Sequence, residues 1–127
     1  MSIATYDART ALVVVDLQND FAHPDGSLFV SGGDTLVDGI NAEIGAARSM
    51  GATVVVSQDW HPASTPHFID DGGVWPTHCV AGTWGAELVD GLDPDHAASA
   101  VIRTGTTGDD GSSAFARRAP GGGDALP

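Results

Sequence analysis

The sequence predicts an α/β fold in which helices flank a parallel sheet. Two short, apolar, β-branched runs are separated by a longer segment whose apolar residues recur at helical spacing, and a polar residue follows each run. A strand, a helix and a second strand in this order form a βαβ unit, whose strands are parallel and whose crossover is right-handed. Ligands of such sheets bind beyond the carboxyl ends of the strands.

The first predicted strand is the run Ala11-Leu-Val-Val-Val15, which is typical of a strand buried in a parallel sheet. Asp16 follows it directly and therefore lies at the carboxyl end of the strand. The helix is expected to begin at Asp34, an N-cap residue after two glycines, and to end before Gly51, which suits the C′ position. The apolar residues at helical spacing between them are Leu36, Val37, Ile40, Ile44 and Ala47.

The second predicted strand, residues 53–56, is followed by Asp59 near its carboxyl end. Residues 60–84 are rich in Pro, Gly and aromatic residues, which predicts one long functional loop. Beyond the loop we expect a short helix over residues 86–92 and a third strand over residues 99–103.

The composition limits the classes of partner. The chain has 127 residues, a length suited to one domain, which we place over residues 1–115 ahead of a disordered tail over residues 116–127. Its net charge is −12 and it contains no lysine, which argues against nucleic acid or an anionic membrane as a partner. A single cysteine excludes an intrachain disulfide, and no apolar run is long enough to span a bilayer. We therefore expect a soluble, cytoplasmic protein.

One carboxylate and three imidazoles fall within the twenty residues from Asp59 to His78. Asp59 and His61 are separated by one residue, so in an extended segment both side chains face the same way, and His67 and His78 follow in the predicted loop. This mixed nitrogen and oxygen set suits one divalent Zn, Mn or Fe ion better than Ca or Mg. The alternative is that these histidines are loop residues that cap backbone groups.

Asp16 is the candidate catalytic carboxylate, because a carboxylate at the end of a buried strand can act as a general base or orient a nucleophile. The alternative is a solvated turn residue. Asp20 is expected to be structural. Cys79, the only thiol, has no helix N-terminus or cation beside it in the sequence to lower its pKa, so we expect it to pack in the interior. Four aromatic residues are candidates either for packing or for the walls of a flat aromatic substrate site: Phe21, Trp60, Trp75 and Trp84.

Several motifs follow the order and spacing of one known family: Val-Val-Asp16-Leu-Gln-Asn-Asp-Phe21, Gly26-Ser27-Leu28, Asp59-Trp-His61-Pro, His67-Phe68, Trp75-Pro-Thr-His78-Cys79-Val and Gly82-Thr-Trp-Gly85-Ala-Glu-Leu88. Over about residues 9–115 the chain resembles the nicotinamidase (pyrazinamidase) branch of the isochorismatase-like cysteine hydrolases. The resemblance implies a Rossmann-like parallel sheet. It also implies hydrolysis of nicotinamide to nicotinate and ammonia, a step of NAD salvage.

The resemblance further implies roles for the site residues. Residues aligned with Phe21 and Trp75 flank the substrate ring in this family. Asp16 matches the Asp of the family's Asp-Lys-Cys triad, in which the cysteine attacks the amide and forms an acyl-enzyme. The family metal, usually Zn, Fe or Mn, receives the pyridine nitrogen, and the positions that hold it match Asp59, His61, His67 and His78.

Two triad members have no match. Thr104 stands at the position of the family lysine, and Arg103 beside it is expected to point to the opposite face of the strand. The nucleophilic cysteine belongs to the family's C-terminal part, whereas Cys79 matches a cysteine that is not the nucleophile. We therefore expect an N-terminal portion of the domain that keeps the metal and substrate half of the site and has negligible activity alone.

Two alternatives stay open: a non-catalytic metal- or pyridine-binding remnant, and a half-enzyme whose partner chain supplies the missing strands. A homo-oligomer is also compatible with the sequence. In the family's strand order the missing strands pair beside the first strand, so the edge of residues 11–15 is expected to be open. The tail after Phe115 has the Arg-, Gly-, Ala- and Pro-rich composition of shifted high-GC coding sequence, and we expect it to be an out-of-frame product.

Overall fold

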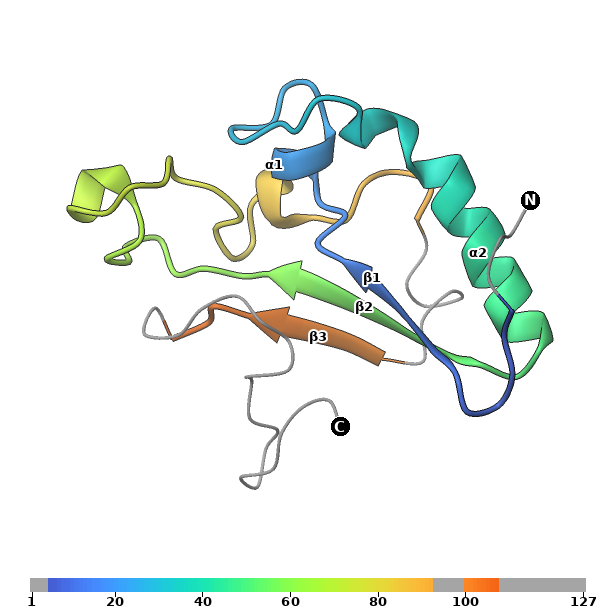
Figure 1. Cartoon of the computed structure of the whole chain (residues 1–127). Coiled ribbons are helices and arrows are strands. Elements are labelled where there is room, and N and C mark those ends of the chain that lie inside the picture. The colour runs from blue at the N-terminus through green and yellow to red at the C-terminus, as the bar shows by residue number, and fades with distance from the viewer. Residues whose placement is uncertain (1–4, 93–99, 108–127) are drawn as a thin grey trace.

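A three-stranded parallel sheet with one long helix against it forms the centre of the molecule (Figure 1). The computed structural model describes residues 5–92 and 100–107. Strands β1 (Ala11–Val15), β2 (Thr53–Asp59) and β3 (Ala100–Thr104) lie in the order β1-β2-β3, and both pairings are parallel. Helix α2 (Val37–Ser49) connects β1 to β2. The predicted α/β class and βαβ unit are therefore confirmed, and β2 continues three residues beyond the run that predicted it.

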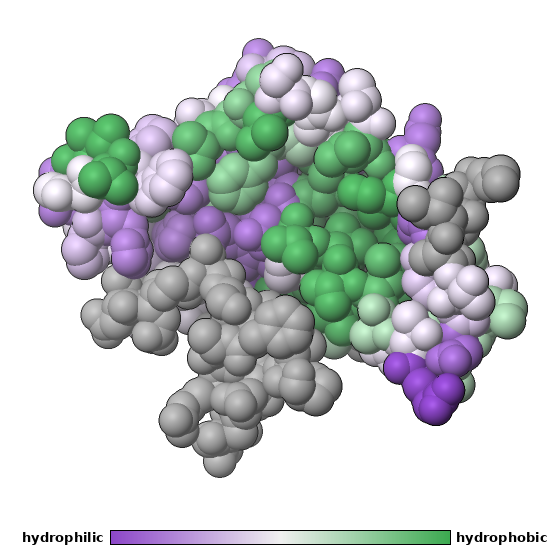
Figure 2. Space-filling model, in the orientation of Figure 1, coloured by the Kyte–Doolittle hydropathy of each residue, from purple (hydrophilic) through white to green (hydrophobic). Residues whose placement is uncertain are grey.

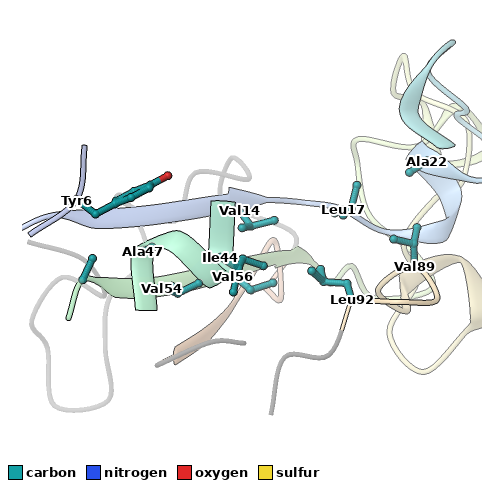
Figure 3. Close-up of a cluster of buried hydrophobic side chains, with 11 residues drawn as sticks. Tyr6, Val14, Leu17, Ala22, Ile44, Ala47, Val54, Val56, Val89 and Leu92 are labelled. Carbon is teal, nitrogen blue, oxygen red and sulfur yellow. The ribbon is translucent and has the colours of Figure 1, made fainter. Parts of the chain in front are cut away.

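The main core lies between α2 and the sheet. Figure 3 shows Ile44 and Ala47 of α2 in one cluster with Val14 of β1 and with Val54 and Val56 of β2. All five side chains are buried. Burying a valine or isoleucine side chain stabilises a fold by about 1.5–3 kcal/mol, so this cluster explains why the β-branched runs and the apolar helix positions come together.

The other face of the sheet carries a smaller apolar cluster, in which Val13 and Ile102 pack against Val55. On the side of the molecule seen in Figure 2, apolar surface gives way to polar surface in the direction of the strands' carboxyl ends. The surface is therefore apolar over part of the sheet and polar toward the end at which the strands finish.

The start of α2 differs from the prediction. Asp34 is not its N-cap: Asp34 lies inside a 3-10 turn, η1 (Gly33–Thr35), and the helix begins at Val37 after Leu36, which makes no side-chain cap. The turn takes up the second glycine and the two residues after it, so α2 begins two residues later than an N-cap at Asp34 indicates.

The end of α2 agrees with the prediction. Gly51 has a φ of 76°, and its N–H donates to the carbonyl of Arg48 at 3.1 Å. The N–H of Ala52 donates to the carbonyl of Ala47 at 2.9 Å. This pair of bonds is a Schellman motif, which explains why glycine ends the helix.

The helix expected over residues 86–92 does not form. A 3-10 turn, η3 (Trp84–Ala86), is followed by chain that pairs with the segment after β1. The carbonyl of Glu87 accepts from Asn19 N–H at 2.9 Å, and Val89 N–H donates to the Leu17 carbonyl at 3.0 Å. These long-range bonds replace the local helical bonds, so tertiary pairing overrides the helical pattern.

Two short elements complete the described chain: the one-turn helix α1 (Asn19–Ala22) and a 3-10 turn, η2 (Ile69–Asp71), within the predicted loop. No helix within residues 5–92 and 100–107 is long and apolar enough to cross a bilayer. Ser99, the first residue of the predicted third strand, and the predicted tail, residues 116–127, lie outside the described residues.

Candidate functional site

Two carboxylates follow neighbouring strands at the same edge of the sheet. β1 ends at Val15, and Asp16 turns the chain away from the sheet with a φ of 53°. Its Oδ1 accepts a hydrogen bond from Ser57 Oγ at 2.7 Å, so its side chain stays against β2. Asp59, the last residue of β2, follows two residues after Ser57. Because alternate residues of a strand face the same side, Asp59 and Ser57 share the face on which Asp16 lies.

The environment of Asp16 alters its acidity. Burial raises the pKa of the Asp16 carboxyl, the hydrogen bond from Ser57 lowers it in part, and the nearby Asp59 carboxylate raises it again. The net pKa is above the ordinary value. A carboxylate with a raised pKa accepts a proton more readily near neutral pH, which suits a general base.

Asp59, His61 and His78 form a buried triad whose ligand atoms lie close enough together to hold a metal ion. Asp59 Oδ2 lies 3.0 Å from His61 Nε2 and 3.4 Å from His78 Nε2. Two ligand atoms that are each about 2.1 Å from a transition-metal ion are about 3.0 Å apart at a right angle and about 3.4 Å apart at the tetrahedral angle. The distances from Asp59 Oδ2 to the two imidazoles therefore fit ligation of a single ion.

The orientation of His78 also fits a cation. Its Nδ1 lies 2.7 Å from the carbonyl oxygen of Pro76, which can only accept, so Nδ1 carries the proton and donates. In the neutral ring the lone pair is then on Nε2, the atom that faces the Asp59 carboxylate. Two acceptors in contact need a metal ion or a proton between them. Holding the non-ligating nitrogen on a carbonyl is the usual way in which proteins orient a metal-binding histidine.

Without a metal, a proton lies between His78 Nε2 and the Asp59 carboxylate. Burial lowers the pKa of His78, but its hydrogen bonds to Asp59 and Pro76 together raise it above the ordinary value. Burial raises the pKa of Asp59, and the hydrogen bonds from His61 and His78 more than offset this and bring it to about 2. The carboxylate is therefore ionised at neutral pH and available as a ligand.

Buried polar atoms of the triad's own side chains have no hydrogen-bond partner within the described residues. They include Asp59 Oδ1 and His61 Nδ1. Both face Gly105, where an added Cβ would lie 2.7 Å from His61 Nδ1 and 3.5 Å from Asp59 Oδ1. A buried polar atom left unsatisfied costs about 1–3 kcal/mol, so these atoms favour a polar ligand at the site.

The fourth predicted ligand, His67, lies near the triad without joining it. Its ring centroid is 6.2 Å from that of His61, and its buried Nε2 lacks a hydrogen-bond partner within the described chain. The fully buried ring of Phe68 packs against both His61 and His78, with centroid distances of 5.5 and 5.4 Å. The structure therefore brings three of the four predicted ligands together and leaves His67 beside them.

Of the candidate aromatic residues, one contacts a histidine of the triad and the others lie in the predicted loop, residues 60–84. The Phe21 ring lies 5.5 Å from the ring of His78, so it borders the triad. Trp75 is half exposed, and its backbone pairs with Phe68 on the loop that carries His67. Trp84 packs edge-on against His23, with 5.0 Å between the ring centroids.

The third strand places Thr104 and not Arg103 beside Asp59. Thr104 is opposite Asp59 in the register, and it is buried. Arg103 is opposite Gln58, with its guanidinium stacked 3.8 Å from the centre of the Trp60 ring. The prediction that Arg103 points to the other face of the strand is confirmed.

Cys79 is fully buried, as expected from the sequence. Its N–H donates to Asp20 Oδ2 at 2.7 Å, and Asp20 Oδ1 accepts from Ser27 N–H at 3.1 Å, so the predicted structural role of Asp20 is confirmed. Burial and then the nearby carboxylates of Asp59, Asp20 and Asp16 raise the pKa of the Cys79 thiol well above its ordinary value.

The state of Cys79 leads to a prediction. An excess of a disulfide reagent such as dithiobis-nitrobenzoate at pH 8 is expected to modify no thiol in the folded protein, because only the thiolate reacts and the Sγ is out of reach of solvent. In denaturant the single thiol is expected to react completely. Rapid modification of the folded protein would show that Cys79 is accessible and ionised.

Two buried polar residues at this edge of the sheet were not predicted from the sequence. Ser57 binds Asp16, and Gln18 binds the backbone of Asp59. Ser57 lies within an apolar strand and Gln18 just after one, and a polar residue at such a position can serve as a signal of an internal hydrogen bond.

Comparisons with known proteins agree with this geometry. The isochorismatase domain family matches residues 10–113. The nicotinamidase of Escherichia coli is 42% identical over 93 residues, which are 61% of this chain and 43% of that protein. The nicotinamidase of Saccharomyces cerevisiae is 37% identical over 103 residues, which are 62% of this chain and 48% of that protein. The chain thus spans about half the length of the curated relatives it matches.

Two solved structures have the same fold. PnC1 from L. infantum, in complex with nicotinate, superposes with a TM-score of 0.74 at 43% identity, covering 84% of this chain and 52% of that one. The pyrazinamidase of Pyrococcus horikoshii, in complex with zinc, gives 0.73 at 40% identity, covering 80% and 55%. With its parallel sheet and its family match over residues 10–113, the chain belongs to the isochorismatase domain family.

Proposed function

We propose that this chain forms the ion- and ring-binding part of a nicotinamidase-type amidohydrolase, which converts nicotinamide and water to nicotinate and ammonia. The observation that carries the proposal is the buried triad of Asp59, His61 and His78 with the Phe21 ring beside it. The nicotinate bound to the L. infantum relative and the zinc bound to the P. horikoshii relative support it.

In this proposal Asp59, His61 and His78, joined by His67, hold one divalent transition-metal ion: Zn, Fe or Mn. When bound, the ion supplies a Lewis acid for the pyridine nitrogen. Phe21 and Trp75 hold the two faces of the ring and exclude water from it. Asp16, whose pKa is raised by burial, serves as general base or orients the nucleophile.

The nucleophile is proposed to come from outside these 127 residues. Hydrolysis through an acyl-enzyme needs a thiolate at the substrate. Cys79 is the single cysteine here, and its burial and raised pKa make it unsuitable. Thr104, which stands beside Asp59, has no charge with which to replace a lysine. We therefore propose that the 127 residues bind metal and pyridine carboxylate or amide but do not turn the amide over alone.

A partner bearing further strands would have a place to pair. β1 is an edge strand of the sheet formed by the described residues, and its last residue, Val15, is 68% exposed. An open apolar edge of this kind readily accepts another strand. We propose that the site is completed there, in the cytoplasm, by a chain or segment that also supplies the nucleophile.

Binding and turnover measured together test the proposed function. The purified chain is loaded with Zn or Mn, its metal content is measured, and nicotinate binding is followed by calorimetry with and without metal. We expect about one metal per chain, nicotinate binding only with metal, and no ammonia from nicotinamide. Absence of stoichiometric metal would refute the site. Ammonia release that is lost in Cys79→Ser would refute the assignment of Cys79.

A further inference from the structure

Strand β1 ends before it reaches Asp59, so it provides no backbone hydrogen bonds to that residue. The register pairs Val15, the last residue of β1, with Ser57, and the Asp16 N–H still donates to the Ser57 carbonyl at 3.2 Å. Asp59, two residues further, presents its backbone N–H and carbonyl to the same side of β2, because alternate residues of a strand hydrogen-bond in the same direction. No β1 residue is opposite Asp59.

The side-chain amide of Gln18 takes the place of the missing strand residue. Its Oε1 accepts from Asp59 N–H at 2.8 Å, and its Nε2 donates to the Asp59 carbonyl at 2.7 Å. Nε2 donates its second hydrogen to the Ala86 carbonyl at 2.8 Å. The side chain is completely buried, so water does not compete for these hydrogen bonds.

The main chain of Gln18 is fixed as well. Its N–H donates to the Asp16 carbonyl at 2.8 Å, and the residue forms an antiparallel bridge with Leu88. The amide is therefore held at a set distance from β2 and joins three segments: the turn after β1, the end of β2 and the turn η3.

We infer that Gln18 is a positioning residue for metal binding, which sets the backbone of Asp59 so that its carboxylate faces His61 and His78. The inference rests on the proposed metal site. Outer-shell residues of this kind typically change metal affinity by about 10- to 100-fold when they are lost. Only glutamine has this combination: glutamate lacks the two N–H donors, asparagine is one methylene shorter, and methionine has the size without the polar atoms.

The chain contains a matched control in Gln58. It is also a buried glutamine that bonds to the Ala86 carbonyl, but at 3.3 Å, and its side chain bonds to neither backbone group of Asp59. Gln18→Met and Gln58→Met therefore remove the same amide from neighbouring buried positions.

The test compares the zinc dissociation constants of the two variants, measured by chelator competition on folded protein, with hydrogen exchange of the Asp59 amide by NMR. For Gln18→Met we expect affinity weaker by about 10- to 100-fold and an Asp59 amide that exchanges rapidly. For Gln58→Met we expect affinity within about threefold of the parent and a protected Asp59 amide. Equal affinity losses in the two variants, or a protected Asp59 amide in Gln18→Met, would overturn the inference.

Gln18→Glu is measured in the same way, and it replaces Gln18→Met where the methionine variant does not fold. The ionised carboxylate can still accept from Asp59 N–H but meets the Asp59 and Ala86 carbonyls without a hydrogen, and a protonated carboxyl can donate to only one of the two, so weaker zinc binding is again expected in either form. Parent-like affinity in Gln18→Glu would contradict the inference. If the parent chain binds no zinc, the proposed function fails, and the exchange of the Asp59 amide still decides whether Gln18 positions that residue.

Discussion

Asp59→Asn is expected to abolish stoichiometric binding of a divalent transition metal. The substitution keeps the size of the side chain but replaces the only carboxylate of the triad with a neutral amide. The amide also places an N–H donor either at Oδ2, which now faces His61 and His78, or at the unpartnered Oδ1. Losing a direct ligand must cost more than the roughly 10- to 100-fold lost with an outer-shell partner, so we expect zinc affinity to fall by more than about 100-fold.

The measurement is metal content after dialysis, followed by competition with a chromophoric chelator. Asp90→Asn is the control, because Asp90 is exposed and the change in net charge is the same. Equal zinc affinity in the two variants would show that the long-range charge of this acidic chain, and not the triad, holds the metal.

The metal-free protein offers a second readout of the same substitution. The Asp59 carboxylate raises the pKa of His78 through a hydrogen bond and through its charge. In metal-free Asp59→Asn the charge is lost and the amide oxygen is a weaker acceptor than the carboxylate, while the burial that lowers the pKa remains. An NMR titration should therefore show His78 deprotonating at lower pH than in the parent chain, and an unchanged titration would contradict the contact.

The parts of the fold that the sequence predicted correctly depend on local patterns. The β-branched runs match β1 and β2, and Gly51 ends α2 because only glycine adopts its positive φ without strain. The prediction of Asp34 as the N-cap was wrong because the 3-10 turn before α2 is stabilised by its own backbone hydrogen bonds. The helix predicted over residues 86–92 does not form because their hydrogen-bond partners, in the segment after β1, are about seventy positions away in the chain.

In the candidate site, too, local spacing could be predicted from the sequence and long-range contacts could not. The spacing of Asp59 and His61 predicts their shared face, and their side chains lie 3.0 Å apart. The approach of His78 depends on a loop whose course is set by tertiary contacts, among them the bond from Cys79 N–H to Asp20. The role of Gln18 could not be predicted, because it depends on β1 ending before β2 does.

Gly85→Ala is expected to destabilise the protein strongly. A Cβ at Gly85 would overlap the carboxylate of Asp20. That carboxylate cannot move aside freely, because it is buried and its two oxygens accept from the N–H groups of Ser27 and Cys79. Overpacking and the loss of a buried hydrogen bond each cost about 1–3 kcal/mol, so we expect the free energy of unfolding to fall by about 2–4 kcal/mol.

Gly45→Ala provides the same chemical change at a permissive position. Gly45 lies inside α2, and a Cβ there would meet nothing within 4 Å. Alanine in a helix interior is more stable than glycine by about 0.5–1 kcal/mol, so this variant is expected to be more stable than the parent. Urea unfolding followed by circular dichroism measures both.

The two alanine variants should therefore shift the urea midpoint in opposite directions. Because Asp20 also holds the backbone N–H of Cys79, next to the proposed ligand His78, Gly85→Ala should weaken zinc binding in the protein that remains folded, whereas Gly45→Ala should leave it unchanged. A stable Gly85→Ala with parent-like zinc affinity would mean that the contact between Gly85 and Asp20 is not needed to place His78.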